Sequence, residues 1–178
     1  MECRESRRHL LPALFFALAL GSTCPSQQSL LDRHHSQPGR TYVELAVGDI
    51  DGDGDIDVIT SRDYSGNDIL VNDGRGRFTL DTKRRIQYAF KQATYCPGLA
   101  DFDGDGDLDL FNTNDHHFRE SLFLNDGKGF FTDVTATHVP ANQSWTDYHV
   151  IADFDGDSDL DVVLLTPFTS DPNLLLRN

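Results

Sequence analysis

The segment Asp49–Asp57, with the sequence DIDGDGDID, decides how this chain is organised. It recurs as DFDGDGDLD at 101–109 and as DFDGDSDLD at 153–161, so the offset is 52 residues both times. A second element repeats with the first: ILVNDGRGRF at 69–78 matches LFLNDGKGFF at 122–131, and LLLRN at 174–178 begins a third copy. Two linked motifs that keep a near-constant period indicate structural repeats.

Each repeat also has the local pattern of β-strands. Short runs rich in β-branched and aromatic residues precede and follow every acidic segment. Asn-Asp-Gly-x-Gly is a turn sequence, because Asn and Gly accept positive φ, and it leads into a phenylalanine. Helical spacing is nearly absent. We therefore expect an all-β fold of about three β-propeller blades, each a short four-stranded antiparallel unit.

The N-terminal residues are expected to be a leader that takes no part in this fold. Basic residues (Arg4, Arg7 and Arg8) precede an apolar stretch at 10–20, which is too short to span a bilayer. This pattern predicts a signal peptide and export to a secreted, periplasmic or cell-surface location, without membrane insertion of the mature chain. The run SRRHLL at 6–11 also resembles a twin-arginine signal.

The predicted division of the chain is therefore a signal peptide and leader over 1–29 and a repeat region over 30–178. Cys24 follows Gly-Ser-Thr and lacks the leucine usual in a lipobox, so a lipid anchor there is not expected. A disulfide between Cys24 and Cys96 is permitted in an oxidising compartment, and two unpaired thiols are the alternative.

The charge of the chain is concentrated in the acidic segments. There are 29 acidic and 15 basic residues, a formal net charge of −14, and each of the three segments holds five aspartates. This balance argues against a nucleic-acid surface and against attraction to anionic lipid. Clusters this dense repel themselves unless a cation lies among them.

The donor set of the segments favours calcium. Numbered 1 to 9, each segment offers carboxylates at positions 1, 3, 5 and 9 and a carbonyl at position 7, and calcium takes six to eight oxygens. Magnesium demands stricter octahedral geometry, and soft metals prefer Cys or His. We predict about three Ca²⁺ sites, with these candidate residues: Asp49, Asp51, Asp53, Asp55, Asp57, Asp101, Asp103, Asp105, Asp107, Asp109, Asp153, Asp155, Asp157, Asp159 and Asp161.

Other interpretations of the acidic segments are possible. A solvated turn without an ion is the simplest alternative. An EF-hand needs a glutamate at position 12 and a dockerin usually has an acidic residue there, but this chain has Thr60, Asn112 and Leu164. Both families also need a helix where this sequence predicts strand, so both are rejected. Ser158 replaces the glycine of position 6 in the third segment, which costs on the order of 1 kcal/mol if φ is positive there.

The combination D-x-D-G-D-G-D-x-D and L-x-N-D-G-x-G-x-F resembles the FG-GAP/VCBS repeat over roughly residues 41–178. That family builds the calcium-binding propellers of integrin α subunits and of many exported bacterial proteins. The resemblance implies that the matching aspartates ligate calcium in a hairpin loop of each blade. It also implies a ring of about seven blades, so three units are an incomplete ring.

The sequence offers no catalytic motif of the G-x-S-x-G, H-E-x-x-H or phosphate-loop kind. His116-His117 is interpreted as surface, Trp145 as core or as a stacking platform for a sugar, and His149 as a pocket residue or a packing residue. We expect a non-enzymatic module for adhesion, ligand binding or scaffolding with structural calcium. Its partner would be a protein or carbohydrate ligand, further blades, or other copies of the chain that complete a ring. An accessory propeller of a larger secreted hydrolase or lyase is the alternative.

Overall fold

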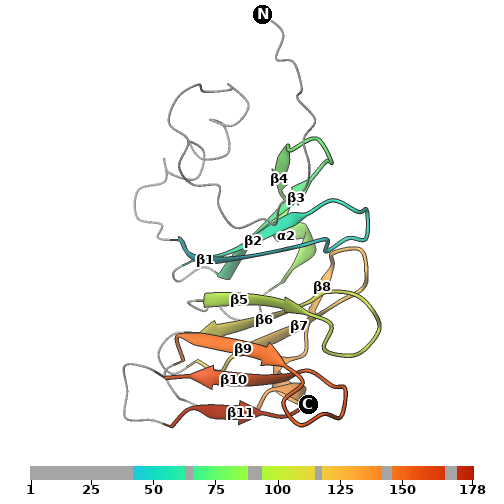
Figure 1. Cartoon of the computed structure of the whole chain (residues 1–178). Coiled ribbons are helices and arrows are strands. Elements are labelled where there is room, and N and C mark those ends of the chain that lie inside the picture. The colour runs from blue at the N-terminus through green and yellow to red at the C-terminus, as the bar shows by residue number, and fades with distance from the viewer. Residues whose placement is uncertain (1–41, 63–65, 88–93, 115–117, 142–145, 167–171) are drawn as a thin grey trace, which may run out of the picture. The chain divides into compact units, whose positions relative to one another are not determined.

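The computed structural model describes residues 42–62, 66–87, 94–114, 118–141, 146–166 and 172–178. The predicted leader, Cys24, the His116-His117 pair and Trp145 lie outside the described residues. Within the described residues, the chain forms three antiparallel sheets that follow one another in sequence order (Figure 1). No helix in these ranges has the length and apolar character needed to cross a membrane.

The first two sheets each have four strands in simple sequence order. The first contains β1 (Tyr42–Gly48), β2 (Asp57–Arg62), β3 (Gly66–Asn72) and β4 (Phe78–Leu80). The second contains β5 (Thr94–Ala100), β6 (Asp109–Asn114), β7 (Ser121–Asn125) and β8 (Phe131–Asp133). A single helical turn follows the fourth strand in each case, namely α2 (Thr82–Arg85) and α3 (Thr135–His138).

The third sheet has three strands among the described residues, in the order β11-β10-β9. They are β9 (Tyr148–Ala152), β10 (Asp161–Leu165) and β11 (Leu174–Leu176). In every sheet the acidic segment is the hairpin loop between the first and second strands. The all-β prediction, with its blade-like units and incomplete ring, is confirmed.

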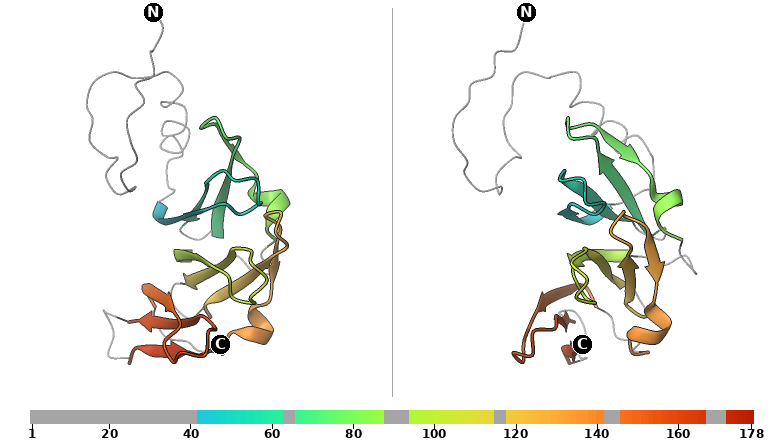
Figure 2. Two further views of the ribbon diagram at one scale, coloured as in Figure 1. Left: turned by 45° about the vertical axis from the view of Figure 1, so that its right-hand side comes forward. Right: turned by 90° about the vertical axis from the view of Figure 1, so that its right-hand side faces the viewer.

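The sheets pack face to face. Because neighbouring residues of a strand point to opposite faces of its sheet, one strand can contribute to two packed interfaces. In β6, Leu110 belongs to a buried cluster with Ile59 and Ile69 of the first sheet, whereas Phe111 belongs to a second cluster with Val162 and Leu164 of the third sheet. The second sheet is therefore covered on both faces. Figures 1 and 2 show the corresponding sequence of sheets, with β5 lying between β1 and β9.

The outer faces of the first and third sheets expose apolar side chains. Leu45 and Val47 on β1 are 61% and 57% exposed, and Tyr148 and Val150 on β9 are 46% and 48% exposed. Among the described residues, the first sheet and the third sheet are therefore each covered on one face only, the face that packs on the second sheet.

His149 packs between the second and third sheets. Its ring lies edge-on to Phe111, with centroids 5.3 Å apart, and a Cβ on Gly98 would collide with its Nε2. Burial lowers the pKa of His149 to about 4, so the ring is neutral at pH 7. These contacts support the interpretation of His149 as a packing residue. Beside it, burial and the neighbouring Glu44 raise the pKa of Cys96 to about 12, which leaves an inert thiol.

Candidate metal centres

The first aspartate of each loop shapes the loop around its carboxylate. Asp49 accepts hydrogen bonds from the backbone amides of Gly52, Asp53 and Gly54 at 2.8, 3.2 and 2.9 Å. The chain can wrap this tightly because Gly52 and Gly54 have φ of 72° and 89°, which side chains rarely adopt. The first aspartates of the second and third loops make the corresponding bonds to positions 4 and 6.

The ninth aspartate is buried and holds two strands together. Asp109 is fully buried, and its Oδ2 accepts from the Phe102 amide at 2.9 Å while Oδ1 accepts from the Asn125 amide at 2.8 Å. Asp57 and Asp161 make the same pair of bonds in their own sheets. Burial raises the pKa of both Asp57 and Asp109, although the backbone hydrogen bonds oppose that shift.

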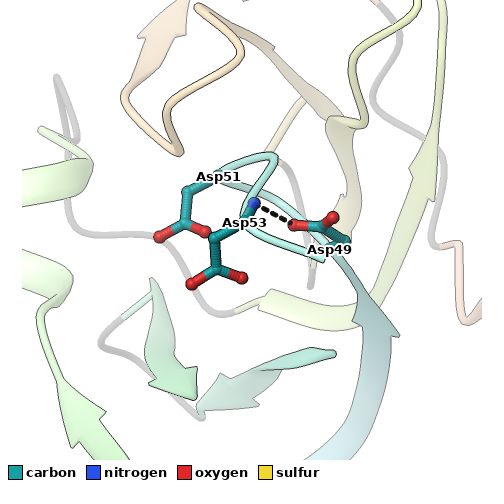
Figure 3. A group of neighbouring side chains, drawn as sticks. All are labelled: Asp49, Asp51 and Asp53. Carbon is teal, nitrogen blue, oxygen red and sulfur yellow. Dashed lines mark hydrogen bonds between the residues drawn. The ribbon is translucent and has the colours of Figure 1, made fainter. Parts of the chain in front are cut away.

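Three carboxylates converge in each loop, with oxygen atoms that all lie within 4.8 Å of one another. Figure 3 shows the group of the first loop, in which the Asp53 amide bonds back to Asp49. The three groups are Asp49, Asp51 and Asp53; Asp101, Asp103 and Asp109; and Asp153, Asp155 and Asp161.

The other predicted site residues lie outside those groups. The clearest cases are Asp55 and Asp107 at position 7, whose carboxylates lie against Gly74 and Gly127 of the Asn-Asp-Gly turn, where a Cβ would collide with them. The remaining residues outside the groups are Asp57, Asp105, Asp157 and Asp159.

The converging groups fit a hard divalent cation. All donors are carboxylate oxygens, the ligand type that calcium and magnesium bind. Oδ1 of Asp51 is buried without a hydrogen-bond partner in the described structure, so it is free to coordinate. Desolvation and the neighbouring carboxylates raise the pKa of Asp107 and of Asp155, which shows that the loops hold negative charge at unfavourable proximity. A bound cation would relieve that repulsion.

The spacing of these loops agrees with a comparison to known families. A family model described as FG-GAP-like repeat matches residues 49–112 and 101–164, so each match runs from one acidic loop into the next. The chain belongs to the FG-GAP-like repeat family. No curated protein matches the chain.

In these FG-GAP-like repeats, the asparagine of the turn links one repeat to the loop of the preceding repeat. The Asn125 side-chain amide donates to the carbonyl oxygens of Ile50 at 2.8 Å and Leu108 at 3.0 Å, and its Oδ1 accepts from the Gly129 amide at 2.9 Å. Asn178 makes the equivalent bond to Phe102 at 2.7 Å. From the sequence, this asparagine is expected only to form a turn. Its recurrence at the same position of each repeat is the signal that could have indicated a second role, the bond to the preceding loop.

Arg85 links the first FG-GAP-like loop to the second sheet. Its guanidinium donates to Asp51 at 2.9 Å, to Asp81 at 3.1 Å and to the Lys128 carbonyl at 2.8 Å, and it lies 5.5 Å from the Phe130 ring centroid. The side chain is buried, so these partners replace its water. The repeat pattern carried no signal for it, because the next repeat has His138 at this position.

Ser158 has a φ of 81°, close to the 89° and 97° of Gly54 and Gly106 at the same loop position. The strain anticipated from the sequence is therefore present in the backbone. We expect Ser158→Gly to raise the free energy of unfolding by about 1 kcal/mol, because glycine adopts this conformation without a steric penalty. Urea unfolding in chelator measures the gain. An unchanged or lower stability would contradict the assignment of strain to this residue.

Proposed function

We propose that this chain is an exported calcium-binding β-propeller repeat module that serves adhesion, ligand binding or scaffolding and uses calcium structurally. The observation that carries the calcium assignment is the convergence of three carboxylates in every loop, with the buried Oδ1 of Asp51 lacking a partner. Export is supported by the basic and then apolar pattern of the N-terminal residues. No reaction is assigned to the module.

The candidate ligands are the three converging aspartates of each loop, and a bound calcium would supply positive charge that cross-links them. Asp49 and its counterparts hold the loop curvature through backbone amides. Asp109 and its counterparts tie the end of the loop to the third strand. The loop is thus built around its carboxylates before any cation arrives, which reduces the ordering that binding requires.

Removal of calcium is expected to lower the melting temperature by roughly 10 °C. At affinities typical of extracellular modules, each site stabilises the fold by about 1 kcal/mol in millimolar calcium, and three sites give about 3 kcal/mol. For a domain of this size, each kcal/mol corresponds to roughly 3 °C. The measurement is a thermal melt followed by far-UV circular dichroism, in millimolar calcium and then in excess chelator.

Two variants make this test specific. Asp103→Asn removes one converging carboxylate and is expected to reduce the calcium-dependent shift by about a third, because one site of three is weakened. Asp133→Asn removes an exposed charge outside the loops, and asparagine keeps an oxygen that can accept the Thr135 amide, so this variant is expected to leave the shift unchanged. Equal melting temperatures of the parent chain in calcium and in chelator would refute the structural role of calcium.

A further inference from the structure

The first acidic loop has a positive charge of the protein's own beside it, the guanidinium of Arg85. It donates to Oδ2 of Asp51 at 2.9 Å, and Asp51 is one of the three converging carboxylates of this loop (Figure 3). The side chains of Arg85 and Asp51 are 9% and 14% exposed, so water screens the pair little. Oδ1 of the same carboxylate is buried without a hydrogen-bond partner in the described structure. A guanidinium and a bound cation would therefore share one carboxylate.

Partners outside the loop fix the guanidinium in this position. It also donates to Asp81, on its own helical turn, and to the Lys128 carbonyl of the second sheet. The Phe130 ring lies beside it, and a Cβ on Gly129 would collide with its Nη1. A cation that enters the first loop cannot move the guanidinium away without breaking these contacts.

The second loop has a different charge environment. Asp103 is the counterpart of Asp51, and within the described ranges it accepts the backbone amide of Asp105 at 3.2 Å but pairs with no basic side chain. Burial first, and then the surrounding carboxylates, Asp126 of the neighbouring turn among them, raise the pKa of Asp107. Negative charge in the second loop is thus less compensated than in the first.

The residue at the repeat position of Arg85 does not replace its charge. This residue is His138, which is exposed, and its Nδ1 lies 3.2 Å from the Val134 carbonyl oxygen at the start of its own helical turn. In the third loop, Arg177 pairs with Asp155 at 3.2 Å, but the arginine side chain is 65% exposed and is therefore screened by water. Among the described loops, a buried guanidinium is a feature of the first.

We propose that Arg85 is an internal counter-ion that competes with calcium for the first loop, so that the second loop fills at a lower calcium concentration. This inference rests on the proposed calcium binding and adds the regulation of one site. Two positive charges held a few ångströms apart repel each other, which raises the calcium concentration that the first loop requires. Without a cation, Arg85 still links this loop to the second sheet, whereas the second loop depends on calcium to relieve its repulsion.

Isothermal titration calorimetry with calcium chloride tests the proposal on full chains in which one loop keeps all its converging carboxylates. Asp103→Asn with Asp155→Asn leaves the first loop and Asp53→Asn with Asp155→Asn leaves the second, which we expect to bind at least fivefold more tightly. Addition of Arg85→Met to the first-loop chain should tighten binding at least fivefold, because one positive charge is removed. Arg84→Met is the matched control on the same helical turn. Its side chain is 69% exposed, so it should change the affinity less than twofold.

A second variant tests the same charge without the loss of a buried network. His138 is exposed, and it lines the same cleft as Asp103, so an arginine at this position can approach the second loop. We expect His138→Arg to weaken calcium binding in the second-loop chain at least threefold. His138→Gln, which adds no charge, should leave the affinity within twofold of its starting value.

The outcomes separate this inference from the proposed function. Absence of calcium binding at every loop would refute both. Equal affinities of the first and second loops would overturn the inference alone, as would a folded Arg85→Met chain whose first loop binds calcium no more tightly. If the Arg85→Met chain does not fold even in calcium, His138→Arg decides, and an unchanged affinity of the second loop then overturns the inference.

Discussion

Replacement of Asp109 by alanine is expected to lower the free energy of unfolding by about 4 kcal/mol, even without calcium. Both carboxylate oxygens accept backbone amides, from Phe102 and from Asn125, at a fully buried position. Alanine leaves these two donors buried without acceptors, and each such group costs about 1–3 kcal/mol. The loss of stability is therefore structural and is expected even when no cation is bound.

Urea unfolding in excess chelator measures this effect apart from metal binding. Asp105→Ala is the matched control, since Asp105 belongs to the same loop but is exposed. Its removal is expected to change the free energy of unfolding by less than about 0.5 kcal/mol under these conditions. If both variants lost the same stability, the buried carboxylate would not have the role assigned to it.

Replacement of Arg85 by methionine is expected to cost about 3 kcal/mol. Methionine preserves most of the side-chain volume but removes the donors to Asp51, Asp81 and the Lys128 carbonyl. Removal of one partner from a largely buried ion pair is destabilising, and the carboxylates left behind on Asp51 and Asp81 are only 14% and 23% exposed. The melting temperature in chelator is the appropriate measure, since a cation at Asp51 would compensate part of the loss.

Arg84→Met provides the comparison for Arg85. Arg84 lies on the same helical turn, but its side chain is 69% exposed and its ion pair with Asp81 is long, at 3.5 Å. Exposed pairs of this kind contribute at most about 1 kcal/mol. A loss for Arg85→Met no greater than that of Arg84→Met would show that the buried network does not hold the junction.

The repeat architecture could be predicted from the sequence because its signals are local and recur. The offset between Asp49, Asp101 and Asp153 identified the period, and the alternation of short apolar runs with turn residues identified the strands. Glycine at position 6 of the first two loops made a positive φ the condition for strain at Ser158, and the structure shows that Ser158 meets this condition.

The different structural roles of the five aspartates within a loop could not be predicted. The sequence presents five similar residues per loop, but the fold buries Asp109 under two backbone amides and turns Asp107 toward Gly127. These roles depend on the third strand and on its turn, which lie some 16 to 20 residues further along the chain. The Arg85 network depends on partners 34 and 43 residues away, so no local pattern could reveal it.

The bond from Asn125 to Ile50 joins residues 75 positions apart. The carbonyl at the start of one loop is therefore satisfied only after the third strand of the following sheet has been made and has folded. During synthesis from the N-terminus, a loop bonded in this way is completed only after the following repeat has been made and has folded. Contacts of such long range slow folding. The smallest segment that contains a loop together with the asparagine that completes it then runs from the first strand of one sheet through the turn of the next sheet. A cut between Leu80 and Thr94 would therefore separate the first loop from Asn125, the residue that completes it.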